Sequence, residues 1–177
     1  MLHENGDNQM MFENPYLKVQ RLNKCNVDNF SVVTVLVKFV MPEFPDKKEF
    51  EKALHTFSHL ADQLCSNENE FYCQVMDVTE CDVVPVSWVL SVVDTIKSQR
   101  HTFYRKLVAT AVIHSNNTFY KFLTSILEKY YDPIKPLAFF SRSNNDNVEF
   151  EVASFFSLYQ HKQNLSTFSS LELPTNL

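Results

Sequence analysis

Residues 30–40 read FSVVTVLVKFV, an almost unbroken run of apolar and mostly β-branched side chains. A run of this kind is typical of a strand in the middle of a sheet, covered on both faces. Residues 71–77 (FYCQVMD) and 107–113 (LVATAVI) have the same character. A short strand is expected at 137–140, and the alternating residues 16–22 predict an edge strand that forms a hairpin with residues 30–40.

Two helices are indicated between these runs. Asp46 is followed three residues later by Glu49, which resembles a capping box, and apolar residues then recur at helical spacing as far as Leu64. Pro85 suits the first turn of a second helix that runs to about Arg100. The expected buried stripe of this second helix consists of Val86, Val89, Leu90, Val93 and Ile96.

A third helix is expected over residues 117–131, whereas the type of the aromatic segment 148–160 stays open. Because strands and helices alternate, the sheet should be mostly parallel, with right-handed crossovers. With 177 residues, 45% of them hydrophobic, the chain fits one core. We therefore predict a single small α/β domain over residues 15–160, with a mostly parallel sheet of four to five strands, helices packed on it and an N-terminal hairpin. Residues 1–14 are expected to form a flexible arm, and residues 161–177 a flexible tail.

The composition excludes several functions. Glycine occurs once, at Gly6, so the chain cannot build a P-loop or a glycine-rich dinucleotide turn, and no cofactor is expected. A net charge of −5 with scattered basic residues argues against nucleic acid as a partner. The four cysteines form no CxxC pair and the N-terminus shows no secretion signal, which indicates reduced thiols and a cytoplasmic protein. No apolar stretch approaches the ~20 residues of a transmembrane helix.

Part of the chain resembles a known family. The segment 84–90 (VPVSWVL), the strand 107–114 (LVATAVIH) and the helix 119–127 resemble the divergent CRAL-TRIO group, which is related to Sec14-type lipid-binding domains and includes the BCH scaffold domains. The resemblance covers about residues 71 to 141. In that group a Pro-x-x-Trp-like helix start precedes a strand ending Val-Val-His-Pro, and here Ser115 replaces the proline.

The STAS (SpoIIAA-like) domains share this order of strands and helices and are the competing resemblance. STAS proteins that act as phosphorylation switches carry an Asp-Ser-Ser-Gly-like turn at a helix start, where this chain has residues 81–85, CDVVP. A phosphorylation switch therefore does not carry over, and both resemblances stay open.

The resemblance implies two roles, docking another protein or holding a lipid in an apolar cleft, and no catalytic residue carries over. A full Sec14-type domain has helices before its sheet that gate the pocket, whereas only an arm and a hairpin come first here. We therefore expect a non-enzymatic interaction module, of scaffold or regulatory type, that binds another protein or a second copy of itself. The alternative is a carrier of a lipid or other apolar ligand, with a pocket between the sheet and the helices at 85–100 and 117–131.

Polar residues follow two of the expected strands, at 77–82 and 114–117, where ligands gather in open α/β sheets. Asp77, His114 and Asn116 are therefore candidate binding residues. A Cys81–His114–Asp77 arrangement could form a thiol nucleophile with its base, but nothing in the sequence supplies an oxyanion site. The alternative is structural: Asp77 caps a turn and His114 bonds nearby backbone. We expect no enzyme activity.

Aromatic residues supply the remaining candidates. Trp88 falls beside the expected stripe of its helix, so it either packs in the core or is an exposed anchor for a partner. The C-terminal aromatic segment either completes or covers the sheet or, if it is exposed, forms a docking surface; its apolar residues are Phe150, Phe155, Phe156, Leu158 and Tyr159. His55 and His59 are four residues apart, a spacing that can chelate a metal, but no third ligand is evident. We expect these two histidines to belong to a solvated helix face, and no metal site.

Overall fold

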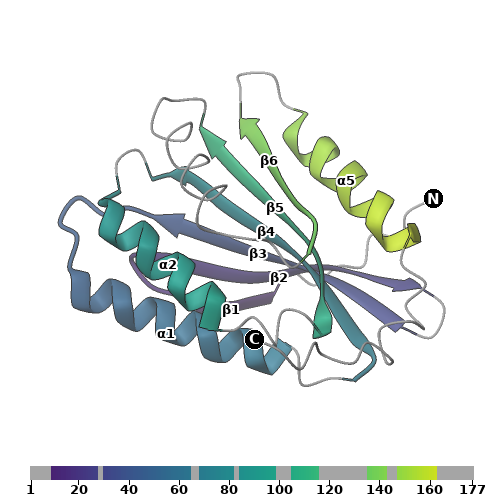
Figure 1. The fold of residues 1–177 in the computed structure, drawn as a ribbon, viewed down its shortest axis with the longest axis horizontal. Helices are drawn as coiled ribbons and strands as arrows, with labels where there is room; N and C mark the ends of the chain where they lie inside the picture. Colours follow the sequence, from purple (N-terminus) through teal and green to yellow (C-terminus); the bar gives the residue numbers. More distant parts are fainter. Residues whose placement is uncertain are drawn as a thin grey trace, which may run out of the picture.

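The computed structural model describes residues 9–27, 30–64, 68–81, 84–98, 105–115, 135–142 and 147–162. The described elements, in chain order, are β1 (Gln9–Glu13), β2 (Leu17–Val27), β3 (Phe30–Val40), α1 (Lys47–Leu64), β4 (Glu70–Glu80), α2 (Val86–Ser98), β5 (Leu107–Ser115), β6 (Leu137–Arg142) and α5 (Val148–Lys162) (Figure 1). The helix expected at 117–131 lies outside the described residues, as do the ends of the expected arm and tail.

The strands form one six-stranded sheet in which spatial order equals chain order, β1-β2-β3-β4-β5-β6. β1, β2 and β3 pair antiparallel, and β3 to β6 pair parallel. This confirms the α/β class and the N-terminal hairpin, although four to five strands were expected. The additional strand is β1, which the sequence analysis assigned to a flexible arm.

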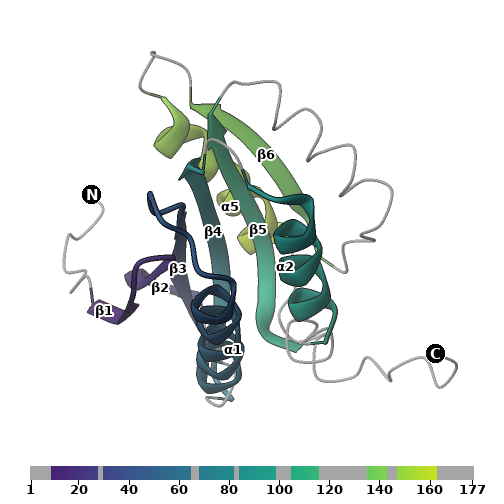
Figure 2. The ribbon, with the colours of Figure 1, turned by 90° about the vertical axis from the view of Figure 1, so that its left-hand side faces the viewer.

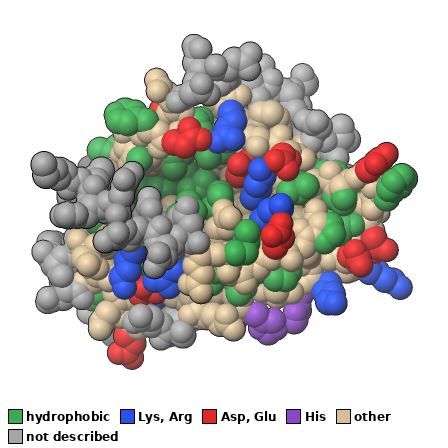
Figure 3. Space-filling model, turned by 180° about the vertical axis from the view of Figure 1, so that it is seen from behind, with side chains coloured by type: hydrophobic (Ala, Val, Ile, Leu, Met, Phe, Trp, Pro, Cys, Tyr) green, Lys and Arg blue, Asp and Glu red, His purple; other side chains and the backbone are tan. Residues whose placement is uncertain are grey.

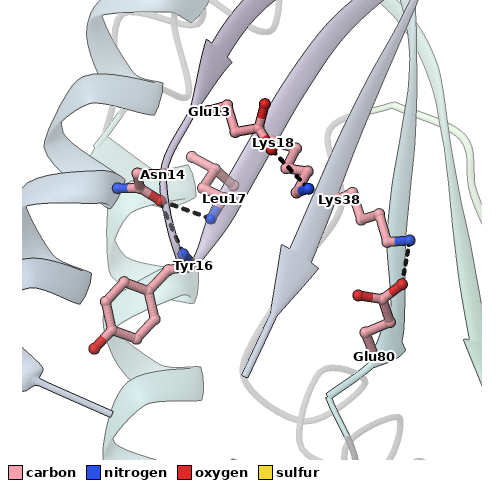
Figure 4. Close-up of polar contacts among 7 residues, drawn as sticks. All are labelled: Glu13, Asn14, Tyr16, Leu17, Lys18, Lys38 and Glu80. Carbon is pink, nitrogen blue, oxygen red and sulfur yellow. Dashed lines mark hydrogen bonds and ion pairs between the residues drawn. The ribbon is translucent and has the colours of Figure 1, made fainter. Parts of the chain in front are cut away.

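A tight turn at Asn14 explains why β1 folds back onto β2. The Asn14 Oδ1 atom accepts hydrogen bonds from the backbone N–H groups of Tyr16 (2.9 Å) and Leu17 (2.8 Å), as Figure 4 shows. The Asn14 N–H in turn donates to the Leu17 carbonyl at 2.9 Å. With the turn closed, β1 satisfies backbone groups along the edge of β2.

The sheet carries helices on both faces. α1 and α2 connect successive parallel strands, and crossovers of one hand place both helices on the same face (Figure 2). The sheet has a hydrophobic core on each face, and alternate side chains of β3 belong to different cores. Val33, Val35 and Val37 pack with α1 and α2, whereas Val32 packs with α5. The face under α5 is covered mainly over β5 and β6.

The start of α1 confirms half of the expected capping box. The Asp46 Oδ1 atom accepts hydrogen bonds from the N–H groups of Lys48 (2.8 Å) and Glu49 (3.2 Å). The Asp46 N–H, which a complete box would pair with Glu49, donates instead to the Tyr16 hydroxyl. The cap therefore ties α1 to the beginning of β2. The expected apolar stripe is buried in α1: Phe50, Ala53, Leu54, Phe57, Ala61 and Leu64.

The buried stripe expected for α2 is confirmed only in part. Val93 is buried and Ile96 packs against the core, but Val86 and Leu90 are 44% and 40% exposed. Trp88, which was expected beside the stripe, is 6% exposed. Trp88 stacks on Phe50 of α1, with ring centroids 4.5 Å apart and ring planes 15° apart. It also meets Tyr16 edge-on at 6.1 Å. We call Tyr16, Phe50 and Trp88 the aromatic cluster; it turns the Trp88 side of α2 toward the core and leaves Val86 and Leu90 facing outward.

The segment whose type the sequence left open is the helix α5. It buries Val148, Val152 and Phe156 against the sheet. The Gln160 Nε2 atom lies 3.8 Å from the Sγ atom of Cys73 in β4. Burial raises the pKa of the Cys73 thiol to about 12, although the Gln160 hydrogen bond opposes this shift. Within the described ranges, no helix is both long enough and apolar enough to cross a membrane.

Candidate functional site

Asp77 serves the structural role that the sequence analysis weighed against binding. Its side chain is 6% exposed. Its Oδ1 atom accepts two hydrogen bonds from Thr79, one from the backbone N–H at 2.9 Å and one from the hydroxyl at 2.7 Å. Asp77 therefore closes a turn at the end of β4.

The sheet register separates Asp77 from His114. Asp77 is aligned with Ile113 of β5, so these two side chains lie on one face and that of His114 points toward the other. The His114 Nδ1 atom lies 2.9 Å from the backbone oxygen of Ser115. Cys81 is buried in the core under α1 and α2. Asp77 is therefore not placed to orient His114, as a thiol nucleophile would require, and Asn116 lies outside the described residues.

A row of charged side chains crosses the face of the sheet that carries α5, in the part that α5 does not cover. The register aligns Glu13, Lys18, Lys38 and Asp77 on four consecutive strands. Glu13 pairs with Lys18 at 2.7 Å and Lys38 pairs with Glu80 (Figure 4). Figure 3 shows acidic and basic side chains side by side on the face of the molecule that is turned away in Figure 1. The hydrogen bond that Lys18 donates to Glu13 raises the pKa of Lys18. Since the charges of this row neutralise each other, the row offers little to an ionic ligand.

The aromatic candidates Phe155 and Phe156 belong to the interior. Phe156 is 5% exposed. Phe155 is half-buried, with ring centroids 5.8 Å from Phe140 of β6, 5.6 Å from Phe156 and 5.0 Å from Tyr159. Of the two readings that the sequence left open, the structure places both residues over the sheet. Trp88, the third aromatic candidate, is likewise a core residue.

The sequence analysis grouped Phe150 and Leu158 with Phe155, Phe156 and Tyr159, but these two residues lie on the opposite side of α5 and are exposed. Phe150 is 73% exposed and Leu158 is 57% exposed. Together with Ser154, which is also exposed, they stand at spacings of four and form one ridge along the helix. Exposed Ser157 lies beside this ridge. We call Phe150, Ser154, Ser157 and Leu158 the outer ridge of α5.

Acidic residues flank the outer ridge. Glu149 and Glu151 lie in the first turn of α5. Glu149 pairs with Arg142 at 2.6 Å, whereas exposed Glu151 makes no ion pair within the described part of the chain. The signal available in the sequence was the 4-residue spacing of Phe150, Ser154 and Leu158, which lies alongside the buried stripe and makes α5 apolar on two sides.

No group of three metal-ligating side chains occurs in the ranges that the structure describes. Comparison of the chain with protein-family models, curated proteins and solved structures finds no match. The outer ridge of α5 is an exposed apolar surface that the core does not explain.

Proposed function

We propose that the protein is a non-enzymatic interaction module that binds an amphipathic helix of another protein on the outer ridge of α5. The exposure of Phe150 and Leu158 is the observation that carries this proposal. The inner side of the same helix already buries Val148, Val152 and Phe156, so the outer residues add nothing to the core.

The outer ridge has enough apolar area to anchor a partner. Full burial of a Phe or Leu side chain contributes about 1.5–3 kcal/mol, so the two together supply about 3–6 kcal/mol. Large apolar side chains that enter a partner's pocket dominate interface energies. Ser154 and Ser157 lie between the anchors, and small residues there let a second helix approach closely. Ridges at spacings of four pack into the grooves of another helix.

Charge indicates the chemistry of the partner helix. Glu151 lies on the outer side of α5, three residues before Ser154, and the chain carries a net charge of −5. A partner with Lys or Arg next to its apolar stripe would pair with Glu151 and approach faster than an acidic one. The CRAL-TRIO resemblance supports the same role, because that group includes scaffold domains.

Carriage of a lipid or other apolar ligand is the second candidate, and the resemblance supports it as well. It needs space between the sheet and its helices. Beneath α2 the aromatic cluster occupies that space, with Phe50 and Trp88 stacked at 4.5 Å. For this reason we favour protein docking.

A titration with synthetic helices tests the proposal. The probes are two fluorescent peptides with the same Leu stripe, one flanked by Lys and the other by Glu. We expect the Lys peptide to bind more tightly. Phe150→Ser combined with Leu158→Ser should weaken its binding by about 100-fold or more, since each 1.4 kcal/mol is a factor of ten.

Phe44→Ser is the matched control, because Phe44 is 85% exposed but lies in the loop before α1. This variant should bind the Lys peptide as the wild type does. Equal binding by the wild type and the Phe150, Leu158 double variant would overturn the docking proposal. A lipid mass retained in native mass spectrometry would favour the carrier instead.

A further inference from the structure

Two histidines lie in contact on the solvent side of α1. His55 and His59 are both exposed, and their ring centroids are 4.5 Å apart with ring planes at 76°. Figure 3 shows histidine side chains gathered at the lower edge of the molecule. Both histidines lie on a solvated helix face, as the sequence predicts, and their imidazole rings are in contact.

Carboxylates continue the same stripe in both directions. Glu51 precedes His55 by four residues and Asp62 follows His59 by three, and both are exposed. Residues three and four apart are neighbours on a helix surface, so the four side chains form one row. The imidazoles thus lie between two carboxylates, an arrangement that attracts a cation, although Glu51 also pairs with Lys47 at 3.7 Å.

The backbone beneath the pair is held firmly. α1 is an 18-residue helix whose other side buries Phe50, Phe57 and Leu64 in the core. A helix fixed in this way pre-organises side chains on its outer face, so little ordering remains when a ligand joins them.

We propose that His55 and His59 bind one divalent transition-metal ion of the Cu²⁺, Ni²⁺ or Zn²⁺ class. Two His at i and i+4 on one helix face are a known arrangement for a shared metal ion, and imidazole suits these metals. Within the described residues no three ligating groups converge, so water completes the coordination. Cu²⁺ binds tightest by the Irving–Williams order, whereas Mg²⁺ and Ca²⁺, which require oxygen ligands, do not bind.

This site is independent of the docking proposal. α1 packs on one face of the sheet and α5 on the other, so the histidines and the outer ridge of α5 share no residue and no helix. Loss of metal binding at the histidines would leave helix docking on α5 intact, and the reverse also holds.

Calorimetric titration of the full chain with Cu²⁺ in a non-chelating buffer tests the site. The key variant combines His59→Ser with Gln63→His, which keeps the number of histidines but separates the pair by eight residues, about 12 Å along the helix. We expect this variant to bind Cu²⁺ at least ten times more weakly at this site. Electron paramagnetic resonance of the Cu²⁺ complex should show two nitrogen ligands in the wild type that the variant loses.

Circular dichroism of both proteins verifies that the variant is folded. Phe150→Ser is the second control and should bind Cu²⁺ as the wild type does. Equal affinity and equal nitrogen coupling in the wild type and the His59, Gln63 variant would overturn the proposal, as would the absence of Cu²⁺ binding by the wild type.

Discussion

Replacement of Trp88 by alanine tests the packing that fixes α2. Trp88 is 6% exposed, and its ring centroid lies 4.5 Å from that of Phe50 and 6.1 Å from that of Tyr16. Truncation of a buried Trp to Ala costs about 3–5 kcal/mol. Each aromatic pair contributes about 0.5–1.5 kcal/mol beyond its buried area. We therefore expect Trp88→Ala to cost about 4–5 kcal/mol, the upper half of the range for a buried Trp. A domain of this size has a free energy of unfolding of about 5–15 kcal/mol, and the variant should lose a large part of it.

Urea denaturation followed by far-UV circular dichroism measures this loss. With a slope of about 2 kcal/mol per molar urea, a loss of 4 kcal/mol lowers the midpoint by about 2 M. Trp88 is the one tryptophan of the chain, so the emission of the wild type should be blue-shifted when folded and move to the red on unfolding.

Two variants complete the test. Trp88→Phe keeps an aromatic ring against Phe50 and should lose less than half as much. Val86→Ala changes a 44% exposed residue of the same helix and should stay within about 0.5 kcal/mol of the wild type. If Trp88→Ala and Val86→Ala shift the midpoint equally, the orientation of α2 described above is wrong.

Two further measurements test single contacts. Asp46→Ala removes the cap of α1 and should lower the free energy of unfolding by about 1 kcal/mol, measured in urea; an unchanged midpoint would contradict the role of the Asp46 side chain. Burial lowers the pKa of Lys135 from 10.5 to about 8, so its charge opposes folding below pH 8 and this penalty fades as the pH rises from 8 to 10.5. Lys135→Met should therefore be more stable than the wild type at neutral pH, with a difference that closes toward pH 10.5; a difference independent of pH would rule out this cause.

The sequence predicted the elements whose signals are local. Residues 30–40 and 107–113 are continuous apolar runs and became central strands, since only a strand covered on both faces buries such a run. Asp46 marked the start of α1 because a cap requires only its own backbone. The parallel pairing followed from the alternation of strands and helices.

Other features depended on contacts that local patterns do not contain. α2 is apolar around most of its circumference, so several stripes were available, and stacking of Trp88 on Phe50 selected one. Residues 9–13 show no strand period; they pair because β2 offers an edge and Asn14 turns the chain back. The two apolar sides of α5 obscured its helical period, so the sequence did not show that Phe156 faces the sheet whereas Phe150 and Leu158 face outward.

The sequence also could not predict that the side chains of Asp77 and His114 lie on opposite faces of the sheet. Both residues follow buried strands, and sequence alone brought them to the same edge. A strand alternates its side chains between two faces, so a register that aligns Asp77 with Ile113 sends His114 to the other side. Which residues are aligned is decided by the whole sheet rather than by either loop.

A sheet whose spatial order repeats the chain order has a consequence for biosynthesis. As a nascent chain leaves the ribosome, each new strand finds its neighbour already made and joins the growing edge, and no strand has to insert between two others. By the time Ser98 has emerged, β1 to β4, the helices α1 and α2 and the three rings of the aromatic cluster are available. Vectorial growth of this kind keeps unpaired apolar strands rare during synthesis, when aggregation is the main hazard.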